Sequence, residues 1–170
     1  MDIKTFIRDV PDFPKKGIMF KDITPLLGNH AAFSDAIKTM AANYKNQKID
    51  YVAGIESRGF IIGTPLAQAL GAGFIPIRKP GKLPYKTKRK EYSLEYGKDS
   101  VEIHEDALKK GQKVLLVDDV IATGGTAKAA AELLKEIGGD LVGIAFLVEL
   151  SFLNGKEKLK GEKVYSLVTF

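Results

Sequence analysis

The chain of 170 residues contains no cysteine and only two histidines. Without cysteine there is neither a disulfide framework nor thiol catalysis. His30 and His104 are isolated from each other, so a histidine–cysteine metal site is not expected. No apolar run approaches the roughly 20 residues of a membrane span. These absences argue against membrane helices and secreted disulfide scaffolds, and the expected compartment is the cytoplasm.

One domain is expected to span residues 1–170, because this length is close to that of a single domain and 45% of the residues are hydrophobic. The segment 2–10 mixes charged residues with apolar ones in the pattern of an amphipathic helix rather than a signal peptide. The proline-rich segment 11–20 is expected to be irregular, since its prolines forbid a helix.

Positive charge is concentrated in one segment. Residues 78–91 hold seven Lys or Arg against one Glu, so the net charge of +5 becomes −1 without them. A nucleic-acid binder would be expected to spread its basic face over the fold. We therefore expect no nucleic-acid partner. Arg78, Lys79 and Lys82 are expected to attract a polyanionic small molecule, whereas residues 86–90 are expected to form a solvated loop without a partner.

Strands and helices are expected to alternate along the rest of the chain. Periodicity and composition predict helices at residues 33–44, 60–70 and 127–137. Apolar runs predict strands at residues 51–55, 73–77, 114–117, 141–150 and 164–170, with short candidates at 93–96 and 101–104. This alternation implies an α/β fold with a mostly parallel central sheet flanked by helices.

The most informative segment is VLLVDDVIATGGT at residues 114–126. Its first four residues read as a strand buried on both faces. Asp118 and Asp119 follow, and because carboxylates are costly to bury, they are expected where the strand ends, at the carboxyl edge of the sheet. Open α/β folds bind their ligands at that edge.

The glycine–threonine loop at residues 122–126 leads into the helix expected at 127–137. Free N–H groups at a helix start and two adjacent glycines suit a phosphate. Capping by Thr123 or Thr126 would explain the loop alone, but it would not explain the paired aspartates. The loop lacks the spacing of a P-loop, and Gly71-Ala72-Gly73 is read as a helix stop rather than a dinucleotide fingerprint.

A second turn, Glu56-Ser57-Arg58-Gly59, also follows a core strand and precedes a helix. Arg58 there could bind phosphate bidentately. Alone, the turn would be read as a capped helix start with an exposed arginine. Two such turns at one sheet edge favour a single shared ligand.

Residues 114–126 resemble the phosphoribosyl pyrophosphate motif of type I phosphoribosyltransferases, in which two acidic residues precede an A-T-G-G-T loop. The resemblance covers almost the whole chain and is strongest to the adenine-specific members, through residues 12–23, 56–59, 78–84 and 92–97. It implies the type I phosphoribosyltransferase fold, with a small N-terminal hood at about residues 1–30 and a mobile active-site loop at about residues 78–97.

The resemblance also implies a role for each matched residue. The 5-phosphate is assigned to Ala122, Thr123, Gly124, Gly125 and Thr126. The ribose is assigned to Asp118 and Asp119. Pyrophosphate is assigned to Ser57, Arg58, Lys79, Lys82 and Tyr96. The adenine pocket is assigned to Met19, Phe20 and Lys21. Catalytic roles fall to Arg58 and to Glu95, which is expected to act as an acid–base or orienting group near the purine.

The implied reaction transfers a phosphoribosyl group to N9 of adenine, giving AMP and pyrophosphate in purine salvage. Mg²⁺ is the implied cofactor, held between substrate oxygens and touched through water, if at all, by Asp118 and Asp119. A homodimer is implied, with no membrane partner. Two alternatives stay open: transfer to hypoxanthine, guanine, xanthine or orotate, and a non-catalytic regulator that senses phosphoribosyl pyrophosphate while binding DNA or RNA.

Overall fold

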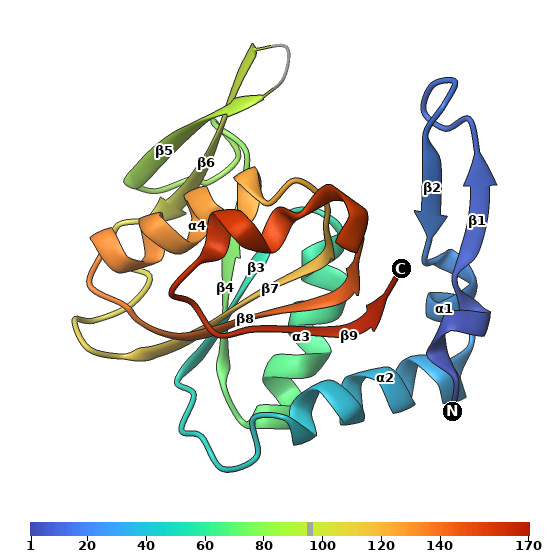
Figure 1. Cartoon of the computed structure of the whole chain (residues 1–170). Coiled ribbons are helices and arrows are strands. Elements are labelled where there is room, and N and C mark those ends of the chain that lie inside the picture. The colour runs from blue at the N-terminus through green and yellow to red at the C-terminus, as the bar shows by residue number, and fades with distance from the viewer. Residues whose placement is uncertain (95–96) are drawn as a thin grey trace.

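The structure, a computed structural model, describes residues 1–94 and 97–170 (Figure 1). At its centre is a five-stranded parallel sheet. Its strands lie in the order β4 (Gly73–Ile77), β3 (Tyr51–Ile55), β7 (Lys113–Ile121), β8 (Asp140–Glu149) and β9 (Val164–Thr169). The expected α/β architecture with a parallel central sheet is confirmed.

Helices and two antiparallel hairpins surround this sheet. The helices are α1 (Thr24–Gly28), α2 (His30–Ala42), α3 (Arg58–Leu70) and α4 (Gly125–Glu136), with short 3-10 segments η1 (Ile3–Phe6), η2 (Ser151–Leu153) and η3 (Gly155–Leu159). One hairpin pairs β1 (Arg8–Pro11) with β2 (Met19–Asp22), and the other pairs β5 (Thr87–Leu94) with β6 (Gly97–His104). Figure 1 shows the two hairpins projecting from different sides of the sheet. Within residues 1–94 and 97–170, no helix is both long enough and apolar enough to cross a bilayer.

The sheet is covered on both faces, which explains its continuous apolar strands. Leu115 and Val117 of β7 pack with α2 and α3, whereas Val114 and Leu116 pack with α4 on the opposite face. All four side chains are completely buried. The hairpin β5–β6 contributes Val101 and other residues of β6 to the α4 face, so it is fixed to the body at its base.

The predicted N-terminal helix at residues 2–10 is wrong. Asp2 caps only the short segment η1, accepting the Lys4 N–H at 3.1 Å, and the chain then extends into β1. Strand β1 is tied to β2 by Arg8, which donates through Nε at 3.0 Å and Nη2 at 2.7 Å to Asp22. The proline-rich segment is irregular as expected only between β1, which ends at Pro11, and β2, which includes Met19 and Phe20.

The basic segment also differs from its prediction as a solvated loop at residues 86–90. Most of it belongs to β5, and Lys90 lies 2.5 Å from Glu136 and 3.4 Å from Glu132 on α4. The short strand candidate at 101–104 lies within β6, and residues 93–94 of the other candidate are the last two of β5. The predicted roles of Glu95 and Tyr96 lie outside the described residues.

Close packing of α3 on the sheet depends on two glycines that face the ring of Phe74. A Cβ on Gly54 would lie 2.7 Å from Phe74 Cζ and 3.0 Å from the Gly59 carbonyl oxygen. A Cβ on Gly63 would lie 2.8 Å from Phe74 Cε2. Because neither side chain exists, α3 can approach β3 closely. At its other end α3 stops at Gly71, whose φ of 65° is left-handed, as predicted.

We predict that Gly54→Ala lowers the free energy of unfolding by about 1 to 3 kcal/mol, the usual cost of overpacking a core. Equilibrium urea denaturation measures the change. Gly28→Ala is the matched control, because a Cβ there would meet nothing within 4 Å. Equal stability of the two variants would contradict the packing argument.

Candidate functional site at the carboxyl edge of the sheet

The acidic pair lies where β7 extends beyond its pairing with the neighbouring strand β3. Pairing between these strands ends at Gly54 and Val117, while β7 continues beside β8 with Asp118 opposite Phe146. The prediction that the strand ends before the aspartates is therefore wrong. The two aspartates nevertheless lie beyond the last residue of β7 that pairs with β3, at the carboxyl edge of that strand and next to the start of α3.

Asp119 is buried, with 5% of its surface exposed. Its Oδ2 lies 2.6 Å from Nε of Arg58, yet no N–H or O–H of the described residues is directed at this oxygen as a hydrogen bond. Arg58 remains 43% exposed on its side chain. A buried acceptor without a directed donor suits a ligand that brings hydroxyl groups or ordered water.

Asp118 is held tightly beside it. Its Oδ1 accepts the Asp119 N–H at 2.9 Å and would lie 2.9 Å from a Cβ placed on Gly59. Burial raises the pKa of Asp118 well above its ordinary value, and the neighbouring charge of Asp119 raises it further. The glycine at position 59 lets α3 start directly against this carboxylate.

The loop at residues 122–126 forms the start of α4 without a side-chain cap. Gly124 is the N-cap with a left-handed φ of 82°, so capping by Thr123 or Thr126 does not explain the loop. A Cβ on Gly124 would lie 2.3 Å from the Gly155 carbonyl oxygen, and one on Gly155 would lie 2.4 Å from that of Ala122. The loop therefore lies backbone against backbone on η3.

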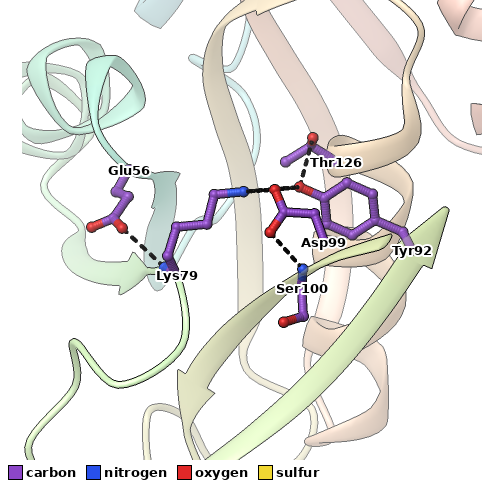
Figure 2. Close-up of polar contacts among 6 residues, drawn as sticks. All are labelled: Glu56, Lys79, Tyr92, Asp99, Ser100 and Thr126. Carbon is purple, nitrogen blue, oxygen red and sulfur yellow. Dashed lines mark hydrogen bonds and ion pairs between the residues drawn. The ribbon is translucent and has the colours of Figure 1, made fainter. Parts of the chain in front are cut away.

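A polar network joins this loop to the basic segment (Figure 2). Thr126 donates its hydroxyl to the Tyr92 hydroxyl at 3.2 Å, and Tyr92 donates to Asp99 Oδ2 at 3.1 Å. Lys79 donates to the Tyr92 hydroxyl at 3.1 Å and pairs with the same oxygen of Asp99. The hydrogen bond from Lys79 lowers the pKa of Asp99, although burial opposes this. Burial likewise opposes the raised pKa of Lys79, which its bonds to Asp99 and Tyr92 produce.

Glu56 fixes the other end of the same segment. Its Oε2 accepts Arg78 Nε at 2.7 Å and its Oε1 accepts the Lys79 backbone N–H at 3.0 Å. Burial opposes ionisation of Glu56, but these bonds and the charge of Arg78 lower its pKa. Arg78, expected to attract a polyanion, is thus occupied by Glu56. Lys82 keeps an exposed side chain.

Of the residues expected around the base, Phe20 is the one in contact with Arg58. The guanidinium of Arg58 lies 5.3 Å from the centre of the Phe20 ring. Met19 is 45% exposed. Lys21 has partners within the chain, with Nζ 2.5 Å from Asp9 and 3.9 Å from the centre of the Phe170 ring. Ser57 is exposed immediately before α3.

Sequence reasoning missed Asp99 and Gly155 in this site, and it named Glu56 in the turn before α3 without giving it a role. Asp99 carries no local motif, and Gly155 and Glu56 are defined by contacts far along the chain. The described part of the chain contains no cluster of three or more His, Cys, Asp or Glu side chains arranged to hold a metal ion. Asp118 and Asp119 still offer the hard oxygen atoms that Mg²⁺ accepts through water.

Comparison with known proteins adds a second line of support. The model of the family described as "Phosphoribosyl transferase domain" matches residues 26–169. An adenine phosphoribosyltransferase from Halothermothrix orenii is 60% identical over 168 residues, 99% of either chain. The crystal structure of adenine phosphoribosyltransferase from Thermoanaerobacter pseudethanolicus is 53% identical and superimposes with a TM-score of 0.97 over 99% of this chain and 98% of that one. The crystal structure of adenine phosphoribosyltransferase from Saccharomyces cerevisiae, complexed with an imino-altritol bisphosphate and adenine, is 43% identical. It superimposes with a TM-score of 0.92 over 98% of this chain and 96% of that one.

The raised pKa of Asp118 predicts a stability effect of definite sign. The folded chain binds the Asp118 proton more tightly than the unfolded chain does. The contribution of Asp118 to the free energy of unfolding is therefore lost as the pH rises above 3.8, the ordinary pKa of this group. We predict that Asp118→Asn raises the melting temperature at pH 7.5, by about 2 to 4 °C for each 1 kcal/mol relieved.

Thermal unfolding between pH 3 and pH 8 checks this prediction, and the gap between variant and parent should close as the pH falls below 3.8. Asp106→Asn, at an exposed position outside the site, is the control and should leave the profile unchanged. A variant less stable than the parent at pH 7.5 would contradict the prediction.

Proposed function

Because this chain belongs to the phosphoribosyl transferase domain family and, within it, to the adenine phosphoribosyltransferases, we propose that the carboxyl edge of its sheet is the active site of that reaction. The enzyme is a transferase of purine salvage that moves the phosphoribosyl group of phosphoribosyl pyrophosphate to adenine, forming AMP and pyrophosphate. The observation that carries the assignment is the buried acidic pair beside Arg58 and the uncapped loop of α4.

The loop at residues 122–126 holds the 5-phosphate in this proposal. Each charge-assisted bond from a backbone amide contributes about 1.5 to 3 kcal/mol, more than the roughly 0.3 to 1 kcal/mol of the helix dipole. Support comes from Gly124, whose left-handed backbone and contact with Gly155 leave the amides of the helix start without a competing side chain.

The ribose hydroxyls donate to Asp118 and Asp119. The Asp119 oxygen without a directed donor supports this placement, because a sugar hydroxyl would satisfy it. Pyrophosphate is assigned to residues that follow the neighbouring strands β3 and β4, namely Ser57, Arg58, Lys79 and Lys82. Tyr96, from the loop proposed to close over the site, is assigned to it as well.

Adenine is assigned to the hood, at Met19, Phe20 and Lys21. Contact between the Phe20 ring and Arg58 supports a base position next to the pyrophosphate site. The Lys21 ammonium is paired with Asp9 and keeps further protons for the base. Glu95 is assigned an orienting or acid–base role near the purine.

In the reaction, the bond from ribose C1 to the pyrophosphate oxygen breaks and a bond from C1 to adenine N9 forms. The electron pair of the broken bond stays with pyrophosphate, whose charge Arg58 and Lys79 stabilise. The sugar becomes cationic, and the carboxylates that hold its hydroxyls favour that charge. Adenine N9 loses its proton on forming the bond, and Glu95, in its acid–base role, is the group assigned to accept that proton.

Mg²⁺ fits this site, because the buried Asp119 oxygen has no directed donor and two adjacent carboxylates suit a hard cation. Asp118 and Asp119 would hold it through water, alongside the oxygens of the substrate. When bound, the ion would neutralise charge on pyrophosphate.

The proposal extends to the assembly and to motion. Residues 1–170 act as one domain in a cytoplasmic homodimer, with residues 1–30 as the hood and residues 78–97 as a loop that closes over the substrates. Closure excludes water and so limits hydrolysis of the activated sugar, as lid loops commonly do.

The central test is incubation of the purified protein with phosphoribosyl pyrophosphate, Mg²⁺ and single bases, with a control lacking Mg²⁺. AMP from adenine, with no nucleotide from hypoxanthine, guanine, xanthine or orotate, is the expected result. Product from another base alone would overturn the pocket assignment. Tight substrate binding without any product would favour a regulator.

We predict that Arg58→Ala lowers kcat/KM for phosphoribosyl pyrophosphate about 10²- to 10³-fold, because a donor aimed at developing charge is worth about 3 to 4 kcal/mol. Steady-state kinetics of AMP formation measures the loss. Lys45→Ala removes an exposed cation outside the site and should leave kcat/KM unchanged. A loss below threefold in Arg58→Ala would remove Arg58 from the site.

We also predict that Glu95→Gln reduces kcat about 10²- to 10⁴-fold at saturating substrates, the range that general acid–base catalysis contributes. The dissociation constant for adenine, measured by calorimetry, should change much less than kcat. Unchanged turnover would show that Glu95 has neither an acid–base nor an orienting role.

A further inference from the structure

The hydroxyl of Tyr92 uses all of its hydrogen-bonding capacity in contacts that link two parts of the proposed site (Figure 2). It donates to Asp99 Oδ2 at 3.1 Å and accepts from Lys79 Nζ at 3.1 Å and Thr126 Oγ1 at 3.2 Å. A hydroxyl has one proton and two lone pairs, so none remains for a ligand.

Asp99 is equally well satisfied. Its Oδ1 accepts the Ser100 N–H at 2.8 Å, while its Oδ2 accepts from both Lys79 and Tyr92. The side chains of Asp99 and Lys79 are 32% and 37% exposed, so the pair is only partly screened by water. A carboxylate with donors on both oxygens has a fixed direction, unlike an isolated surface ion pair.

Lys79 is consequently held at both ends. Glu56 accepts its backbone N–H at 3.0 Å, and Asp99 and Tyr92 take two of the three ammonium protons. One proton stays available to a ligand. Lysine has a flexible four-carbon stem, so fixing its ammonium before binding removes a cost that a free side chain would bear on binding.

We propose that Asp99 and Tyr92 are positioning residues for phosphoribosyl transfer. They hold the Lys79 ammonium toward the pyrophosphate and connect it, through Thr126, to the loop that takes the 5-phosphate. Neither touches the reacting atoms. The inference rests on the proposed function, because the direction of Lys79 matters only if pyrophosphate binds beside it.

Binding of pyrophosphate and of ribose 5-phosphate, the two halves of the substrate, distinguishes positioning of Lys79 from a general structural effect. Dissociation constants for pyrophosphate and for ribose 5-phosphate, each with Mg²⁺, are measured by calorimetry on the whole chain. Asp99→Asn and Tyr92→Phe should each weaken pyrophosphate about tenfold, equivalent to about 1.4 kcal/mol. The KM for phosphoribosyl pyrophosphate should rise in parallel. Ribose 5-phosphate should bind within twofold of the parent.

Matched controls remove the same groups elsewhere. Asp106→Asn removes an exposed carboxylate just beyond β6, and Tyr165→Phe removes a hydroxyl on β9, distant along the sheet from β3. Both should bind pyrophosphate like the parent. Circular dichroism and thermal unfolding confirm that every variant is folded.

A double-mutant cycle with Lys79→Gln tests whether Asp99 acts through Lys79. Adding Asp99→Asn to Lys79→Gln should weaken pyrophosphate no further, because the group being positioned is already gone. Fully additive losses would overturn the inference. So would equal losses for pyrophosphate and ribose 5-phosphate, which a general structural role of the hairpin would produce.

If Asp99 acted only by repelling pyrophosphate, the opposite result would be expected. In that case Asp99→Asn would bind pyrophosphate more tightly, and that result, or unchanged binding, would overturn positioning even while the parent enzyme makes AMP. If the parent makes no nucleotide from any base, the proposed function fails instead.

Discussion

Two adjacent carboxylates near the end of one strand, with Arg58 beside them, are the constraint around which this site is arranged. Asp119 is almost completely buried, and its neighbour Asp118 titrates with a raised pKa because burial and the second charge disfavour ionisation. Gly59 has no side chain because one would collide with Asp118. Helix α3 therefore begins against the acidic pair, and Arg58 is placed to face it. The repulsion between the two carboxylates destabilises the fold at this edge, and a ligand that neutralises their charge would relieve it.

Most of the central sheet and the phosphate-type loop could be predicted from the sequence because the signals are local. The apolar run of residues 114–117, the acidic pair and the glycines all lie within one short segment. Buried strands, a helix of alanine and leucine and a glycine stop at Gly71 are likewise specified by adjacent residues. Only the length of β7 was underestimated, because its continuation depends on pairing with β8.

The remaining features depend on contacts that sequence spacing does not reveal. Ile3 and Ile7 lie at helical spacing and are buried, yet the helical turn is limited to η1. From Arg8 the chain extends into β1, whose partner strand β2 comes later in the chain. Lys90 belongs to a strand because it pairs with Val101 of β6, and its ammonium meets Glu132 and Glu136 of α4. Asp99 has no motif at all. Its place in the site is defined by Lys79, which follows β4, and by Tyr92, which lies opposite Asp99 in the β5–β6 hairpin.

The contact between Gly124 and Gly155 has a consequence for the order in which the enzyme is made. The loop that starts α4 takes its shape against the backbone of η3, and η3 follows β8 in the chain. On the ribosome, the acidic pair and the loop emerge well before their support does. The nascent chain thus carries every residue of the loop before it has the surface on which that loop is shaped, so the loop can take this shape only after residues 155–159 have been added.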